Sequence, residues 1–167
     1  LVFRQYGGGL GLGGKGGFGV VMARQGNGRW GAPAFMKSVD GSVGFQIGGQ
    51  RVEMVILFMN KESMESFREG RFRIGVGAGA AAGPAGANVE GKIGAPVLVY
   101  ADNTGLYIGA TIEGGVLIPD NDANAALYRV EAISVPDIIF KGGLGFPSEA
   151  EGFRAALHAV NPETYIV

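Results

Sequence analysis

Glycine is the feature that most constrains the fold of this chain. The 167 residues include 32 glycines, about a fifth of the chain against a usual share of about 7%. They do not recur at every third position, as in collagen, and they are interleaved with Val, Ile, Phe and Leu, which flexible linkers lack. Glycine inside strands permits bulges, sharp bends and close approach of backbones. The sequence therefore predicts a β-rich fold with bent strands.

The expected strands are short runs of β-branched or aromatic residues bounded by Gly, Asn or Asp. They cover residues 16–24, 42–48, 51–59, 97–101, 105–112 and 114–118. Between the first two, Asn27-Gly28 favours a tight hairpin turn with positive φ. For the last three, an antiparallel meander is the economical connection.

Residues 72–83 carry a second glycine pattern, in which apolar residues alternate with glycine at period two. Such a strand has one face without side chains, so another element must pack closely on it. We expect this strip to be covered within the domain. The glycines concerned are Gly75, Gly77 and Gly79.

Capping residues predict a few short helices. Asn60 precedes a helix over residues 61–70, and Ser134 precedes a helical turn that starts near Pro136. Ser148 and Glu151 have the spacing of a capping box before a terminal helix, whose inward face would carry Phe153, Leu157 and Val160. The expected fold is α+β: one domain over residues 1–167, with a strongly curved antiparallel sheet or barrel-like core and a few short helices, including a C-terminal one.

Composition excludes several function classes. The net charge is -1, which provides no broad basic face for nucleic acid. There is no cysteine, so disulfides, thiolate metal sites and cysteine nucleophiles are excluded. With 47% hydrophobic residues the chain is too apolar for disorder, yet its longest charge-free apolar run, around Val55 to Met59, is too short to cross a bilayer.

The glycine-rich stretch near the start matches phosphate-loop patterns without their context. Residues 9–15 fit the first part of a Walker loop, but position 16 is Gly where Ser or Thr must bind magnesium. Strand-like sequence follows in place of the helix that nucleotide loops require, and no kinase motif appears downstream. We interpret the stretch as a glycine-bent strand and expect no cofactor.

A calcium loop is the nearest approach to a metal site. Asp120, Asp122, Asn124 and Glu131 occupy positions 1, 3, 5 and 12 of such a loop. Position 6, which requires Gly, is Ala125, and the preceding residues look like a strand. The pattern fits better as a helix start capped by Asp or Asn, so we expect no metal.

No catalytic constellation is complete. Ser42 lies in a sequence where Asp40 replaces the first glycine of a nucleophile elbow, and the single imidazole, His158, falls on the predicted terminal helix. His158 is expected to be a surface or half-buried helix residue. The sequence therefore predicts a domain that is not an enzyme.

A series of motifs in fixed order resembles the SYLF family across almost the entire chain. The motifs are GKGGFGVVMARQGNGRWGAPAF (14–35), GSVGFQIGGQ (41–50), VILFMN (55–60), AAGPAG (81–86), YADNTGLYIGATIEGGVL (100–117) and DNDANAALY (120–128). The chain departs from the family pattern at Gly31, where Ser is common, and at Ala87, where Arg is common. The second departure weakens any transferred claim about phosphate binding.

The resemblance implies a binding function. It implies a module that associates with anionic lipid or a membrane surface, with a protein partner of the actin-regulator type as the alternative. It also implies that a helical segment usually precedes the point where this chain starts. We expect a bacterial envelope or periplasmic location, with a cytoplasmic peripheral membrane location as the alternative.

Cations near the predicted turns are the candidate contacts to a lipid headgroup. With the adjacent tryptophan they are Lys15, Arg24, Arg29, Trp30, Lys37, Arg71 and Arg73. Most such cations are solvated surface charges, and Trp30 and Pro33 beside a hairpin are more often core anchors than ligand contacts. Both interpretations remain open at the level of sequence.

Overall fold

The structure is a computed structural model that describes residues 1–10, 12–42, 47–65, 67, 72–73, 80–82, 97–104 and 116–160. The chain divides into two compact units. The first comprises Leu1–Gly19 and Met36–Ile118, and the second comprises Val20–Phe35 and Pro119–Val167. This division into compact units does not test the prediction of a single domain. None of the described helices has the length and apolar character needed to span a bilayer.

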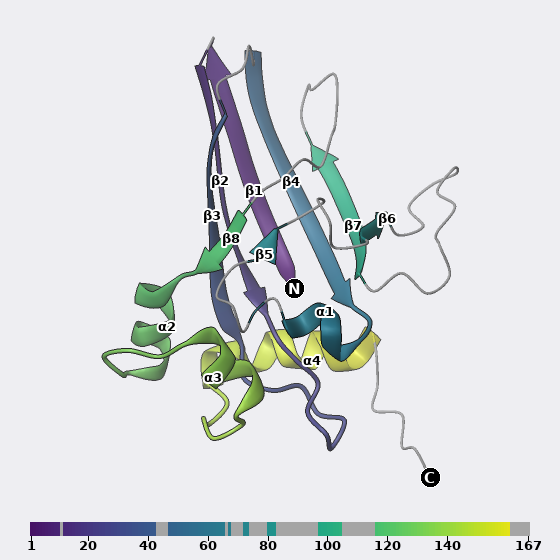
Figure 1. The fold of residues 1–167 in the computed structure, drawn as a ribbon, viewed down its shortest axis with the longest axis vertical. Helices are drawn as coiled ribbons and strands as arrows, with labels where there is room; N and C mark the ends of the chain where they lie inside the picture. The colour runs from purple at the N-terminus through teal and green to yellow at the C-terminus, as the bar shows by residue number, and fades with distance from the viewer. Residues whose placement is uncertain are drawn as a thin grey trace. The chain divides into compact units, whose positions relative to one another are not determined.

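The described strands form one open sheet in the order β5-β8-β3-β2-β1-β4-β7-β6 (Figure 1). β4 pairs antiparallel with both β1 and β7, whereas the short β6 pairs parallel with β7. The predicted α+β class with an antiparallel sheet is confirmed. The barrel-like alternative is wrong, because β5 and β6 are the two edges of the sheet. The strands are β1 Val2–Leu10, β2 Leu12–Val21, β3 Ala34–Ser42, β4 Ile47–Phe58, β5 Phe72–Arg73, β6 Ala80–Ala82, β7 Val97–Thr104 and β8 Val116–Pro119.

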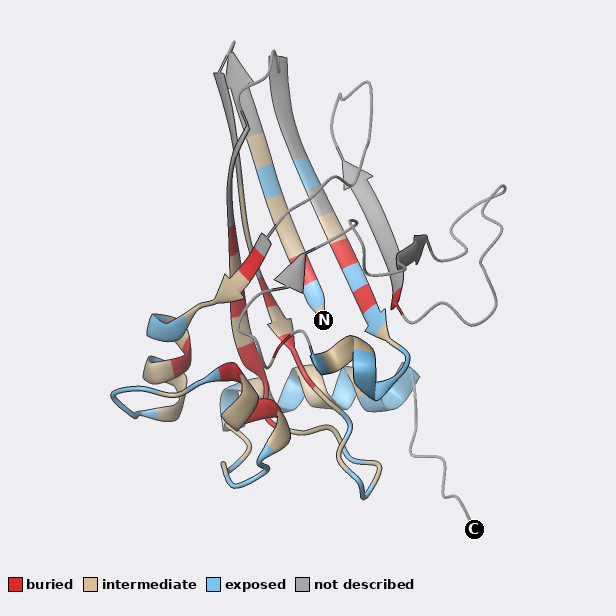
Figure 2. Ribbon diagram, viewed as in Figure 1, coloured by how far each residue is buried: buried red, intermediate tan, exposed pale blue. Residues whose placement is uncertain are grey.

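Side chains alternate between two faces along β1 and β4, as period-two strands require. Phe3 lies opposite Met54, and both are buried. Their neighbours Val2 and Val55, also opposite each other, are exposed. Figure 2 shows this alternation as bands of red and pale blue along β4. One face of this pair of strands therefore carries core residues, and the other carries exposed side chains.

Glycine permits close packing where β2 passes the Phe3 side chain. A Cβ atom added at Gly19 would lie 2.4 Å from the carbonyl oxygen of Val2 and 2.6 Å from Cδ2 of Phe3. At Gly17 it would lie 2.5 Å from the Arg4 carbonyl oxygen and 2.7 Å from Cζ of Phe3. The intervening Phe18 is exposed. Two glycines at period two thus leave room for one aromatic ring.

This arrangement is the one that the sequence predicted for Gly75, Gly77 and Gly79. Those three glycines lie outside the described residues, so that expectation stays a prediction. The same physical reasoning applies to Gly17 and Gly19, which lie in the predicted strand 16–24.

Most of the described strand predictions are confirmed. Residues 16–24, 51–59, 97–101 and 114–118 correspond to parts of β2, β4, β7 and β8. Segment 105–112 lies outside the described residues, and segment 42–48 instead spans the end of β3, residues 43–46 that are not described, and the start of β4. β3 was not predicted, because the buried residues among its described side chains are Ala34, Met36 and Ser38, none of which is β-branched or aromatic.

The helices are short. They are α1 Lys61–Glu65, α2 Asn121–Tyr128, α3 Val135–Phe140, the 3₁₀ turn η1 Ser148–Ala150 and α4 Glu151–Val160. The predicted caps at Asn60 and Ser134 are confirmed: Asn60 Oδ1 accepts from the Ser63 amide at 2.8 Å, and Ser134 Oγ accepts from the Asp137 amide at 3.2 Å. After α1, the buried Phe67 ring packs edge-on against Phe58 of β4, with centroids 5.1 Å apart.

The C-terminal helix is present, but its predicted capping box is wrong. The Ser148 hydroxyl donates to the Glu149 carboxylate at 3.1 Å, because residues 148–150 form a separate 3₁₀ turn. Glu151 instead pairs with Arg154 at 2.6 Å. The inward face was also predicted wrongly at Val160, which is 81% exposed.

Candidate functional site

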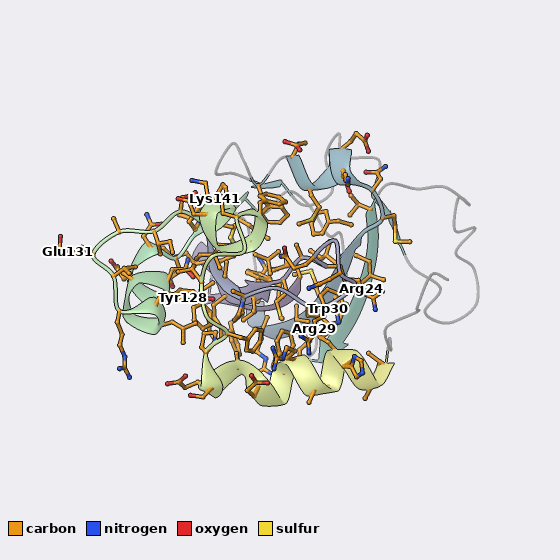
Figure 3. All side chains as sticks on the ribbon, turned by 90° about the horizontal axis from the view of Figure 1, so that it is seen from below. Arg24, Arg29, Trp30, Tyr128, Glu131 and Lys141 are labelled. Carbon is orange, nitrogen blue, oxygen red and sulfur yellow. The ribbon has the colours of Figure 1, made fainter. Side chains whose placement is uncertain are left out.

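The connection between β2 and β3, residues 22–33, carries three of the candidate binding residues and is here called the hairpin arm. Arg24, Arg29 and Trp30 lie on it (Figure 3). Lys37 lies on β3, in the other compact unit. The structure therefore brings together a subset of the predicted residues. Of the remaining candidates, Lys15 and Arg73 fall in strands without a described side chain, and Arg71 lies outside the described residues.

The tip of the hairpin arm is a tight turn built by glycine and asparagine. The Gly28 amide donates to the Gln25 carbonyl, and the Gln25 amide donates to the Arg29 carbonyl, both at 2.9 Å. Gly28 has φ of 80°, which the third position of such a three-residue loop favours. Asn27 accepts from the Arg29 amide through Oδ1 at 3.0 Å. The predicted hairpin turn is confirmed, with positive φ at Gly28 alone of the Asn27-Gly28 pair.

The two arginines and the tryptophan occupy adjoining positions on this turn. Arg24 and Trp30 form an antiparallel bridge, and Cζ of Arg24 lies 5.3 Å from the Trp30 ring centroid. This geometry is a cation–π contact. Arg24 and Arg29 are exposed, whereas Trp30 is half-buried. In Figure 3 the three labelled side chains lie next to one another along the arm.

The base of the hairpin arm is fixed by side chains of α2. Asn124, fully buried, accepts from the Phe35 amide at 2.7 Å and donates to the Phe35 carbonyl at 3.0 Å. The Tyr128 hydroxyl donates to the carbonyl of the buried Pro33 at 2.5 Å. A buried amide must satisfy both its donor and its acceptor, and here the backbone of one residue does so. These contacts set where the arm leaves β3.

A further contact holds the arm near its tip. Gln25 Nε2 donates to the Ile139 carbonyl at the end of α3, at 3.1 Å. The arm is thus attached to α2 at its base and to α3 near its tip, all within one compact unit. This attachment limits the conformational entropy that Arg24 and Arg29 would lose on binding a ligand.

Burial shifts the ionisation of the tyrosine that anchors the arm. It raises the pKa of the Tyr128 phenol to about 12, because the phenolate would be poorly solvated there. The hydroxyl therefore remains protonated, and remains a donor to Pro33, throughout the neutral range.

The interpretation of Trp30 and Pro33 as core anchors is confirmed for Pro33, which is fully buried. Trp30 is intermediate: its indole Nε1 is buried and has no hydrogen-bond partner within the described part of the chain. The remainder of the ring contributes a partly accessible apolar surface beside Arg24.

Two residues of the calcium-loop pattern, Asp120 and Asn124, have structural roles. Asp120 caps α2, with Oδ1 accepting from the Ala123 amide at 3.4 Å, as the capping interpretation predicted. Asn124 uses its side chain on Phe35, and Glu131 lies on the exposed loop after α2 (Figure 3). Across the residues with described placement, no group of three or more His, Asp or Glu side chains is arranged to hold a metal ion.

The other rejected motifs also fall in ordinary secondary structure. The phosphate-loop pattern runs through β1 and β2, with strand where a nucleotide loop needs a helix. His158 is exposed on α4, as predicted, and Ser42 is the last residue of β3. The anchoring roles of Gln25, Asn124 and Tyr128 were not predicted from the sequence, in which Asn124 stood out only as position 5 of the calcium-loop pattern. A polar residue inside the apolar pattern of a short helix was the available signal for Asn124.

The comparisons identify related proteins over most of the chain. Residues 39–160 match the profile of the Ysc84 family, described as "Las17-binding protein actin regulator". The chain is 37% identical to an SH3 domain-containing protein of Schizosaccharomyces pombe over 123 residues. This alignment covers 70% of the chain. It is 32% identical over 150 residues to SH3 domain-containing YSC84-like protein 1 of Rattus norvegicus, and 28% identical over 145 residues to Protein YSC84 of Saccharomyces cerevisiae. These two cover 87% and 83% of the chain.

The matched region is only part of each relative. It spans 29% of the S. pombe protein, 44% of the rat protein and 31% of the S. cerevisiae protein. No solved structure matches the chain significantly.

Proposed function

The chain belongs to the Ysc84 family, also called SYLF, and on that premise we propose that it is a non-catalytic domain whose hairpin arm binds anionic phospholipid at a membrane surface. The observation that carries this proposal is the grouping of Arg24, Arg29 and Trp30 on one anchored turn. Residues 22–33 contain these two cations and no carboxylate.

The physical basis is an electrostatic and interfacial attraction. Each Arg near an anionic membrane surface contributes about 1 kcal/mol of binding free energy. The partly accessible Trp30 ring adds apolar area that the interfacial region of a membrane favours, while its indole Nε1 stays buried in the fold. The attachment of the arm to α2 and α3 presents these groups without a large ordering cost.

Trp30 makes the arm directly observable, since it is the single tryptophan of the chain. Its fluorescence should change when the protein is titrated with vesicles of phosphatidylcholine and phosphatidylserine, and not with phosphatidylcholine alone. Substituting Arg24→Gln and Arg29→Gln together should lower the partition coefficient roughly 10- to 30-fold.

A matched control removes the same charge elsewhere in the same compact unit. Lys141→Gln with Arg129→Gln eliminates two exposed cations outside the arm and should change vesicle binding much less. Equal losses in the two double variants would contradict a localised site. Equal binding to both vesicle compositions would contradict anionic recognition.

A protein partner is the second candidate, and the family match favours it. The family profile is described as a Las17-binding actin regulator, and the rat relative is named as YSC84-like. Co-sedimentation with actin filaments in the absence of lipid tests this candidate. Filament binding that the arm double variant retains, together with no vesicle binding, would replace the lipid proposal.

The cellular location that we propose is the bacterial envelope or periplasm, and its support is the sequence resemblance alone. Fractionation of the source cells, followed by detection with an antibody to the chain, tests it. Recovery in the cytoplasmic or peripheral membrane fraction would favour the alternative.

A further inference from the structure

The exposed face of β1, β2 and β4 carries apolar side chains that the hairpin arm does not involve. Phe18 is 56% exposed and Tyr6 is 43% exposed, and their rings lie 6.1 Å apart. Val2, Val55 and Leu57 are exposed to 38–40%. A cluster of exposed apolar side chains on one face of a sheet indicates an interaction surface, whereas scattered single ones do not.

A row of charges crosses the same face. Arg4 on β1 lies directly opposite Glu53 on β4, and its guanidinium is 2.7 Å from the carboxylate. Arg51 pairs with the same carboxylate. The hydrogen bond from Arg51, with the charge of Arg4, holds the pKa of the Glu53 carboxyl below its usual value. The row therefore keeps its alternating charges at neutral pH.

The register of β1 and β4 makes this face complementary to itself. Val2 lies opposite Val55, Arg4 opposite Glu53, and Tyr6 opposite Arg51. Consider a twofold axis that lies just outside this face, parallel to the strands and above the line midway between β1 and β4. Such an axis would place each residue of one copy against the register partner of that residue in the other copy. Valine would then meet valine, arginine would meet glutamate, and tyrosine would meet arginine.

We propose that this face is an isologous contact between two copies of the chain, packed sheet against sheet with their strands aligned. Aligned sheets pack about 10 Å apart, a spacing that these side chains fill. The two Arg4–Glu53 contacts across the axis fix the register, and the valines supply apolar area. An anionic membrane fits this face less well, because the face carries the Glu53 carboxylate.

Charge reversal on separate chains gives a specific test. Glu53→Arg alone would oppose two arginines across the axis, and Arg4→Glu alone would oppose two glutamates, so each variant should sediment as a monomer. An equimolar mixture of the two variants restores both pairs and should form a heterodimer. The wild-type chain should dimerise at micromolar concentration in sedimentation velocity, with each single reversal weakening the dimer by about tenfold or more.

Two matched valines test the apolar part of the contact. Val55→Asp should weaken the dimer, whereas Val130→Asp, at a valine of similar exposure outside this face, should leave it unchanged. Far-ultraviolet circular dichroism and urea midpoints establish that each variant is folded. A wild-type chain that stays monomeric up to roughly 100 μM, or reversed variants that do not associate when mixed, would overturn the proposal. So would a monomer whose vesicle binding is lost in Val55→Asp, which would assign the face to a membrane.

Discussion

Two regions of the molecule are stabilised in different ways. Around Phe3, the sheet depends on shape: Gly17 and Gly19 lack the side chains that would collide with the ring and with the neighbouring backbone. Around the hairpin arm, the fold depends on hydrogen bonds from Asn124, Tyr128 and Gln25 to the backbone. The first region is sensitive to added volume, and the second to lost polar groups.

The largest expected effect is overpacking at Gly19. Gly19→Val should lower the free energy of unfolding by about 3 kcal/mol or more, because its Cβ would meet the Val2 carbonyl and Phe3, and a backbone atom cannot move aside cheaply. The urea midpoint measures this. Gly16→Ala is the control, since its Cβ has an ordinary contact of 3.7 Å to the Ser38 carbonyl oxygen. Similar midpoints for both variants would show that the Phe3 region tolerates added volume.

The second effect is loss of the buried amide on α2. Asn124→Ala should cost about 2–3 kcal/mol, because the amide and carbonyl of Phe35 would both lose their side-chain partner. Denaturation with circular dichroism measures the change. Asn121→Ala, at an exposed position of the same helix, should change stability by about 0.5 kcal/mol or less. An equal effect at both positions would remove the distinction between the two regions.

A smaller effect, dependent on pH, is expected at Tyr128. Tyr128→Phe removes the hydrogen bond to Pro33 and should cost about 1 kcal/mol near neutral pH. The pKa of Tyr128 is raised by burial to about 12, so its stabilising contribution is fully present below pH ~10 and is lost as the pH rises through 12.

The stability difference between wild type and Tyr128→Phe should therefore be constant from neutral pH to about 10 and then shrink. Subtracting the variant removes the titration of the other tyrosines. A difference that grows above pH ~10 would contradict a phenol that is buried and protonated in the folded state.

The smallest effect is expected to have the opposite sign. Ser38 is buried in β3, and its hydroxyl has no hydrogen-bond partner among the described residues. Ser38→Ala should leave stability unchanged or raise it by up to about 1 kcal/mol, since it removes an unsatisfied polar group at little cost in volume. Calorimetry would detect the shift in melting temperature. A clear loss of stability would reveal a partner for the hydroxyl and make this part of the sheet resemble the hairpin-arm region.

Local features of the fold were predictable from neighbouring residues. The Asn27-Gly28 turn and the caps at Asn60 and Ser134 involve groups at most four residues apart. The exception was the capping box at Ser148 and Glu151, where a 3₁₀ turn replaced the start of the helix. The spacing of a capping box specifies the types of side chain, but it does not specify whether the residues between them begin an α-helix or form a 3₁₀ turn.

The candidate site was predictable only in part. Arg24, Arg29 and Trp30 come together because they are close in sequence on a hairpin. Lys37 belongs to the other compact unit, and the anchors of the arm come from residues about 90 to 115 positions away. No local pattern indicates that Asn124 would bond to the backbone of Phe35.

The sequence by itself determined the composition-driven features: a glycine-rich antiparallel sheet, short capped helices, a tight hairpin turn and membership of a family through ordered motifs. These depend on the conformational preferences of single residues and on period-two alternation. The tertiary structure decided the strand order, the open edges, the inward face of β3 and the attachment of the hairpin arm to α2 and α3. The physical reason is that pairing and burial between distant segments depend on which surfaces meet, and residue types alone do not specify that choice.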